Sequence, residues 1–223
     1  MTESQAREEI CRIGQSLFQR GYVHASAGNI SLRVGTGFLI TPTDACLGFL
    51  DPAQLAMLNV NGTQISGATA SKTIALHRQI YAASDASAQA LPALCVIHTH
   101  STHCVARSLT CNDTELLPPI TPYFVMKVGH VPLIPYHRPG NGAAATAVAQ
   151  TITRYAQQGT PIRAVMLSRL GPIVWHQNLA SAMATLEELE ETAKLMNLCA
   201  AQSPASLSEL QLQELKENFG AHW

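Results

Sequence analysis

The sequence predicts a single mixed α/β domain in which short strands form one sheet that is flanked by helices. Two observations lead to this prediction. Segments with apolar residues at helical spacing alternate with short runs rich in β-branched residues, and glycine, proline and asparagine separate them. The chain of 223 residues also has the length of one sizeable domain, without an internal repeat or a low-complexity tract.

The N-terminal third predicts one helix followed by two hairpins. Ile10, Ile13 and Leu17 recur at helical spacing, and Gly21 ends that helix. Asn61-Gly62 is a strong hairpin signal between two short apolar runs. The predicted elements are a helix over 3–20, strands over 30–33 and 38–41 around Gly35-Thr36-Gly37, a strand over 57–60 and its return strand from 64.

The rest of the chain predicts helices that alternate with strands. Ser71 is a candidate N-cap, and the prolines within 112–122 rule out regular pairing there. We interpret the acidic run within 187–191 as the solvent-exposed face of a long helix. The predicted elements are helices over 72–83, 102–109, 143–156, 179–196 and 207–217, and strands over 94–97, 131–135, 163–167 and 173–175.

Composition and charge exclude several classes of function. Only 13% of the residues are charged against 47% hydrophobic, so we expect part of the surface to be buried in a homo-oligomer. The net charge is -1 and no basic tract exists, which predicts no binding to nucleic acid or to a membrane. The absence of an apolar span and of a signal-like N-terminus predicts a cytoplasmic protein. The six cysteines form no CxxC pair, so we expect free thiols.

The candidate site of chemistry lies where the buried strand over 94–97 ends. His98 and His100 follow this strand at a spacing that places both imidazoles on one side. Two neutral imidazoles on one face are a suitable pair of metal ligands. An isolated pair of this kind is more often two ordinary hydrogen-bonded histidines, so the remaining motifs have to decide.

Seven short segments occur in an order that characterises one family. They are SAGNIS (26–31), TPT (41–43), SK (71–72), HTHS (98–101), TPY (121–123), VPLIPY (131–136) and LEELEETAKL (186–195). Together they resemble the class II aldolases of the fuculose-phosphate aldolase/adducin group. Within this group the chain is most similar to the 3-oxo-tetronate 4-phosphate decarboxylases.

The resemblance implies an α/β/α sandwich around a mostly antiparallel sheet over residues 1–203, with 204–223 as a C-terminal helical tail. It implies a homotetramer with active sites between subunits. It also implies a divalent metal ion, Zn²⁺ or Mn²⁺, on His98 and His100, and a Tyr123 that donates a proton in a neighbouring subunit's site. The implied contacts to the substrate phosphate are Asn29, Thr43, Ser71 and Lys72.

Two positions depart from the family's pattern at the chemical centre. Thr73 stands where relatives have a catalytic glutamate, and Leu170 stands where they have the third histidine ligand. Catalytic zinc normally takes three protein ligands, so another histidine has to complete the set if a metal is bound. The candidates are His130, which we place first, and His77, His103, His137 and His176.

The resemblance predicts a lyase that decarboxylates a 3-oxo-tetronate 4-phosphate to dihydroxyacetone phosphate and carbon dioxide. This reaction needs no base that removes a proton from carbon, whereas aldol chemistry does, so Thr73 favours decarboxylation. Two alternatives stay open: an aldolase or epimerase that acts on another sugar phosphate, and a non-catalytic scaffold or sugar-phosphate binder. The missing glutamate and histidine motivate the second of these.

Overall fold

A single sheet organises the chain in the computed structural model, which describes residues 1–202 and 204–223. Over these residues the sheet has 8 strands in the order β4-β3-β2-β1-β5-β8-β7-β6. The β6–β7 pair is parallel and the other pairs are antiparallel, as the resemblance implied. The strands are β1 Asn29–Val34, β2 Gly37–Ile40, β3 Ala56–Asn59, β4 Gln64–Ser66, β5 Cys95–His98, β6 Leu133–Ile134, β7 Ala164–Leu167 and β8 Gly171–His176.

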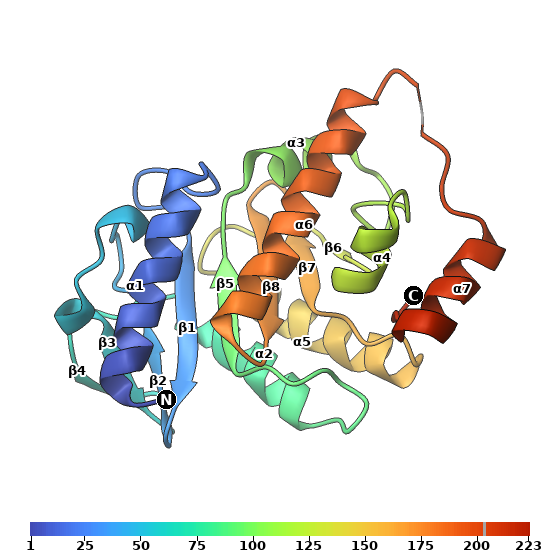
Figure 1. The fold of residues 1–223 in the computed structure, drawn as a ribbon. Coiled ribbons are helices and arrows are strands. Elements are labelled where there is room, and N and C mark those ends of the chain that lie inside the picture. Colours follow the sequence, from blue (N-terminus) through green and yellow to red (C-terminus); the bar gives the residue numbers. More distant parts are fainter. Residues whose placement is uncertain (203) are drawn as a thin grey trace.

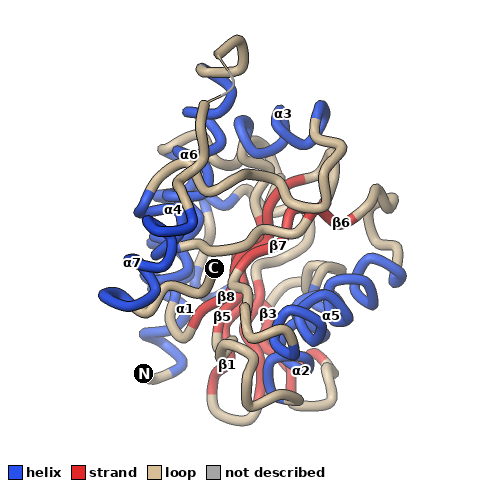
Figure 2. Tube along the Cα trace, turned by 90° about the vertical axis from the view of Figure 1, so that its right-hand side faces the viewer, coloured by secondary structure: helices blue, strands red, loops and turns tan. Residues whose placement is uncertain are grey.

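Helices cover both faces of the sheet (Figures 1 and 2), which confirms the predicted sandwich. One layer contains α1 Glu3–Gln19, α3 Thr102–Thr110, α4 Pro122–Lys127 and α6 Leu179–Leu198. The other layer contains α2 Ile74–Asp85 and α5 Gly142–Gln157, which pack against each other. The helix α7 Glu209–Phe219 lies against α4, and short 3-10 turns occupy Leu47–Phe49 and Pro52–Gln54.

Successive side chains of the central strands pack alternately against the two helix layers, so the protein has a core on each face of the sheet. On β5, Ile97 belongs to the cluster under α1 and α6, while its neighbour Val96 belongs to the cluster under α2 and α5. On β8, Val174 and Trp175 divide in the same way. Successive side chains of a strand point to opposite faces, so a sheet covered on both sides needs apolar residues at every position.

Three helix starts differ from the predictions by more than one residue, and for one of them the difference is only that α7, predicted from 207, begins at Glu209. The helix predicted from 72 begins at Ile74, because the Ser71 hydroxyl and carbonyl accept the amides of Thr73 and Ile74 in a preceding turn. The helix α4 was not predicted. It forms because the Thr121 hydroxyl accepts the Phe124 amide and because proline is compatible with the first position of a helix.

The interpretation of the acidic run as solvent-exposed is wrong for Glu190. Its side chain is buried, and its two carboxylate oxygens accept the backbone amides of His103 and Cys104 at 2.9 and 3.0 Å. These amides open α3 and have no partner within that helix. Glu190 therefore caps the helix that follows the His98–His100 pair, and a negative charge at a helix N-terminus is stabilising.

The C-terminal segment returns to the body of the protein. Leu212 and Leu215 of α7 pack with Val125 of α4, and the Trp223 ring stacks on His130 at 4.2 Å between centroids. The division at residue 203 stays a prediction. The cysteines are free, as expected. None of the helices in the described part of the chain combines the length and the apolar character that crossing a bilayer requires.

Candidate active site

The end of β5 lies directly beside the start of β1, and this pairing creates the site. His98 is the register partner of Asn29 in the antiparallel β1–β5 pair. Gly28, immediately before β1, has a φ of +83°, and a Cβ there would lie 2.8 Å from the His98 carbonyl oxygen. Glycine is therefore required for this close approach, which explains why the SAGNIS turn and the HTHS segment belong together.

Hydrogen bonding fixes which nitrogen of His98 carries the proton. The His98 Nδ1 atom lies 2.9 Å from the Pro172 carbonyl oxygen, which can only accept, so Nδ1 carries the hydrogen. The Nε2 atom then keeps its lone pair, the form that a metal ligand or a hydrogen-bond acceptor needs. Burial, reinforced by His100, lowers the pKa of His98 to about 4. At neutral pH this imidazole is uncharged.

The second imidazole lies against the first. The ring centroids of His98 and His100 are 5.1 Å apart. Burial, followed by the neighbouring His24, lowers the pKa of His100. The pair therefore consists of two neutral rings that share one opening, and a sequence spacing of two residues correctly predicted this arrangement.

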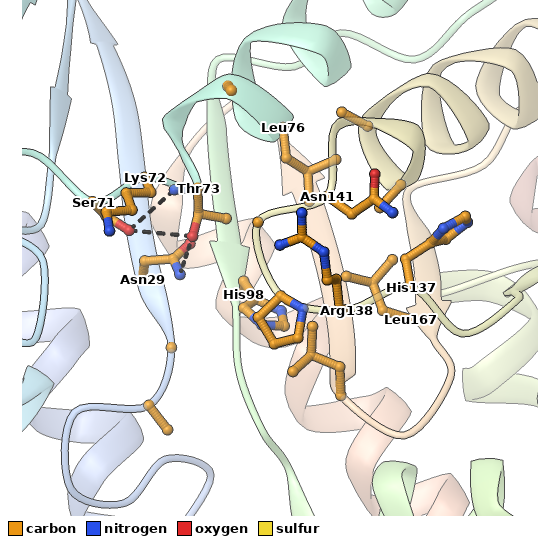
Figure 3. A pocket seen from close by; sticks show the side chains of 18 of the residues that line it. Asn29, Ser71, Lys72, Thr73, Leu76, His98, His137, Arg138, Asn141 and Leu167 are labelled. Carbon is orange, nitrogen blue, oxygen red and sulfur yellow. Dashed lines mark hydrogen bonds between the residues drawn. The ribbon is translucent and has the colours of Figure 1, made fainter.

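A cavity of ≈ 490 Å³ opens above the pair. This volume suits a small ligand rather than a polymer. Five segments around His98 and His100 contribute to its walls: the turn that ends at Asn29, the loop 42–44, the turn 71–73 before α2, the loop 135–142 before α5, and the turn 167–170 after β7 (Figure 3). The segments are far apart in sequence and meet because β1 and β5 are neighbours and α2 packs against α5.

The residues expected to contact a phosphate all line this cavity: Asn29, Thr43, Ser71 and Lys72. Thr73 lines it with them. The Thr73 hydroxyl joins the wall, since it accepts from the side chains of Asn29 and Ser71, each at 3.2 Å. Lys72 is exposed and forms no ion pair with any residue that the structure describes. The Asn29 Oδ1 atom is buried without a hydrogen-bond partner, so an acceptor remains available. We refer to these five residues as the phosphate wall, after the phosphate contacts that the resemblance implies for four of them.

Three buried polar residues next to this wall, Ser31, His77 and Tyr81, form a polar seam between β1 and α2. The Ser31 hydroxyl lies 2.7 Å from both His77 Nδ1 and the Tyr81 hydroxyl. Thr73 at the N-cap of α2 and His77 and Tyr81 within α2 follow at intervals of four residues and share one face of the helix. Asn29 and Ser31 are two residues apart on one face of β1. Burial, followed by His98, lowers the pKa of His77 to about 3, so this seam carries no charge.

The residues present do not complete a three-ligand zinc site. Across residues 1–202 and 204–223, no group of three or more His, Cys, Asp or Glu side chains is placed to hold a metal ion. Leu170 and Thr73 line the cavity beside the histidine pair, and neither can replace an imidazole or a carboxylate there. The set is one protein donor short of the three that a catalytic zinc ion normally takes.

None of the candidate third ligands joins the pair, so the expectation for His130 is wrong. Its Nδ1 atom lies 3.1 Å from Glu115, and its ring stacks on Trp223. Of the other four, His77 bonds Ser31, His103 bonds Glu190 and His176 is at the far end of β8. His137 lines the same cavity from the loop before α5, but among the described residues it does not form a group of three metal-binding side chains with His98 and His100. Sequence spacing does not reveal spatial neighbours across a sheet.

Two residues of the site were missed from the sequence. His24 lies edge-on to His100 with ring centroids 6.4 Å apart, and its position just before the SAGNIS turn was the available signal. Arg138 lines the cavity from the loop before α5, and no spacing argument points to it.

Tyr123 does not line this cavity. It lies on α4, on the opposite face of the sheet from α2 and α5, and its side chain is 61% exposed. Its assignment as a proton donor in a neighbouring subunit's site stays a prediction.

Comparison with known proteins finds relatives over nearly the whole chain. Residues 8–197 match the family described as the class II aldolase and adducin N-terminal domain. The chain is 52% identical to the 3-oxo-tetronate 4-phosphate decarboxylase of Cupriavidus necator, over 100% of this chain and 99% of that protein. It is 38% identical to the enzyme of the same name from Escherichia coli K12, over 96% of each.

Solved structures extend the comparison to the fold. YgbL from Escherichia coli, described as an aldolase, epimerase or decarboxylase, superposes with a TM-score of 0.84 at 37% identity, over 96% of this chain and 99% of that chain. An L-fuculose 1-phosphate aldolase superposes with a TM-score of 0.82 at 20% identity, over 99% of this chain and 98% of that chain, and that likeness shows the fold alone.

Proposed function

Because the chain belongs to the class II aldolase and adducin family, we propose that it is a carbon–carbon lyase that decarboxylates a 3-oxo-tetronate 4-phosphate. The products are dihydroxyacetone phosphate and carbon dioxide. Two relatives, which match this chain at 52% and 38% identity over nearly their whole length, are named for this activity. The observation that carries the proposal is one cavity that holds the phosphate wall beside the neutral His98–His100 pair.

The reaction breaks the bond between C1 and C2 of the substrate. The electron pair of that bond forms a double bond between C2 and C3, and the C3 carbonyl oxygen takes the negative charge. A proton then adds to C2, which yields the ketone of dihydroxyacetone phosphate. The C3 carbonyl receives the electrons, so no base has to remove a proton from carbon. Thr73 in place of a glutamate is therefore compatible with this reaction and unfavourable for aldol chemistry, which starts with such a removal.

Each wall of the cavity has a proposed task. The phosphate wall holds the phosphate through hydroxyl and amide groups and the Lys72 ammonium, and the Asp44 carboxylate on the same side has to point away from the dianion. Without a metal ion, the Nε2 lone pair of His98 would accept a hydrogen bond from a substrate hydroxyl; with a metal ion bound, the same lone pair would be its ligand. The burial of Asn29, Ser71 and His98 partly excludes water from these polar contacts and so strengthens them. We assign protonation of C2 to Tyr123 of a neighbouring subunit or to water.

The cofactor and assembly belong to the same proposal. Zn²⁺, with Mn²⁺ as the second choice, is the expected divalent metal, and His98 and His100 are its proposed protein ligands, although the described side chains leave it one donor short. The resemblance implies a homotetramer, and the exposed side chains of Tyr123, Phe49 and Phe219, at 61%, 81% and 64%, are candidates for contacts between subunits. The small cavity and the net charge of -1 support a sugar-acid phosphate rather than nucleic acid or a membrane as the partner. We expect the protein to act in the cytoplasm.

A coupled assay tests the activity. The 3-oxo-tetronate 4-phosphate is generated in situ, and dihydroxyacetone phosphate is measured through its NADH-dependent reduction, with the spontaneous decarboxylation rate subtracted. We expect turnover that falls at least tenfold in Lys72→Ala at subsaturating substrate, while Arg12→Ala on the exposed face of α1 retains wild-type turnover. A rate equal to the spontaneous rate, with and without Zn²⁺ or Mn²⁺, would overturn the proposal.

A non-catalytic sugar-phosphate binder is the second candidate, and Leu170 together with Thr73 favours it. It predicts saturable binding of the phosphorylated sugar acid with no turnover. Retro-aldol cleavage of another sugar phosphate in the same assay would instead indicate an aldolase.

A further inference from the structure

The wall opposite the phosphate wall carries one long cationic side chain. Arg138 belongs to the loop 135–141 that connects β6 to α5, and it lines the cavity. In Figure 3 its guanidinium lies between the phosphate wall and the wall that carries His137 and Asn141. The loop is fixed where it meets the helix: the Arg138 carbonyl accepts the Asn141 amide at 3.1 Å, and Asn141 caps α5 through the Ala143 amide at 3.0 Å.

Each side of the cavity carries one cationic side chain, and the carboxylate lies on only one side. Among the described residues that line it, the lysine and arginine side chains are Lys72 on the phosphate wall and Arg138 on the opposite side. The lining carboxylate is Asp44, which is next to Thr43 and therefore on the Lys72 side. Arg138 forms no ion pair within the described part of the chain. Its five N–H donors are available to a ligand.

We propose that Arg138 binds the carboxylate of a sugar-acid phosphate whose phosphate lies on the phosphate wall. The inference rests on the substrate class of the proposed function and assigns the orientation of the substrate: phosphate toward Lys72, carboxylate toward Arg138, and the carbons in between over His98 and His100. A guanidinium binds a carboxylate with two parallel hydrogen bonds, whereas an ammonium acts as a point charge.

In this orientation the substrate makes contacts that the product cannot make. The substrate has two anionic ends and contacts both sides of the cavity. Loss of carbon dioxide removes the end that Arg138 binds, so dihydroxyacetone phosphate keeps only the contacts of the phosphate wall. Arg138 therefore contributes to substrate affinity without contributing to product affinity, which favours product release.

Three stable ligands test the proposal by calorimetry on the full chain, without any need for turnover. Erythronate 4-phosphate has both anionic ends, erythritol 4-phosphate lacks the carboxylate, and erythronate lacks the phosphate. For Arg138→Ala we expect a 10- to 100-fold loss of affinity for erythronate 4-phosphate and an unchanged affinity for erythritol 4-phosphate. Lys72→Ala is expected to weaken both phosphorylated ligands. Arg138→Lys should recover part of the affinity, because it keeps the charge and loses the planar fork.

The controls separate this inference from a folding defect and from the proposed function. Arg12→Ala, an exposed arginine substitution on α1, should bind all three ligands like the wild type, and thermal melts of each variant check the fold. An equal loss of both phosphorylated ligands in Arg138→Ala would assign Arg138 to the phosphate and overturn the proposal, as would no loss at all. Carboxylate-selective loss in a protein without decarboxylase activity would support this subsite while the proposed reaction fails.

Discussion

Replacing Ser31 by alanine is expected to lower the free energy of unfolding by about 2–6 kcal/mol. The Ser31 hydroxyl lies 2.7 Å from both His77 Nδ1 and the Tyr81 hydroxyl. The relative exposures of the three residues are 0%, 0% and 1%, so water cannot replace the lost partner. Each polar group that is left buried and unpaired costs about 1–3 kcal/mol, and the substitution leaves two of them.

Two matched variants locate the effect. Tyr81→Phe removes one hydroxyl while Ser31 keeps His77, so we expect a loss of about 1 kcal/mol. Ser66→Ala, a serine-to-alanine change on the exposed strand β4, should change the free energy of unfolding by less than about 0.5 kcal/mol. Urea unfolding followed by circular dichroism gives these values by linear extrapolation.

The double variant Ser31→Ala/Tyr81→Phe tests whether the groups act as one unit. Residues of one hydrogen-bond network are not additive, so the double variant should lose less than the sum of the single variants. A loss below about 1 kcal/mol in Ser31→Ala, or full additivity, would refute the argument that buried polar pairing stabilises this seam.

Three further predictions concern the metal pair, the pH dependence and the backbone. Leu170→His adds an imidazole to the wall of the cavity beside His98, and should tighten Zn²⁺ binding by about 100-fold in a chelator competition; unchanged affinity would contradict the assignment of this position. Burial, followed by Arg163, lowers the pKa of His176 to about 4. The unfolded chain then binds a proton at His176 that the folded chain excludes, so the free energy of unfolding should fall as pH drops from about 6.5 toward 4. His176→Gln should reduce the dependence of the free energy of unfolding on pH in this range. An unchanged dependence would contradict the lowered pKa of His176. Gly28→Ala places a Cβ 2.8 Å from the His98 carbonyl oxygen at a φ of +83°, and should cost about 1–3 kcal/mol in urea unfolding; a neutral result would show that this turn can relax.

Local patterns were sufficient for most of the fold. The order of helices and strands follows from apolar periodicity, and the hairpin at Asn61-Gly62 follows from turn chemistry. The short helix α4 was missed, because 122–127 has too few residues for a periodic signal and begins at a proline. Glu190 was misread for a different reason: a charge run does not show that one of its members caps a distant helix.

The site was predictable only where its members belong to short motifs. The phosphate wall and His98–His100 line one cavity as expected, because each segment is contiguous and the resemblance gave their order; their chemical roles stay predictions. Arg138 and His24 were missed, since their places depend on how α2 packs against α5 and how the first turn meets β5. The wrong expectation for His130 has the same origin: its neighbours Glu115 and Trp223 are brought to it by tertiary structure.

The central claim is that this cavity promotes the loss of carbon dioxide from a phosphorylated 3-oxo sugar acid. Carbon-13 NMR of the reaction with substrate labelled at C1 follows the fate of that carbon directly. We predict that the label appears as bicarbonate, with stoichiometric unlabelled dihydroxyacetone phosphate, faster than in a sample without protein, and that Lys72→Ala slows this reaction. Label retained in a two-carbon fragment, or released only at the rate of the protein-free sample, would contradict the account.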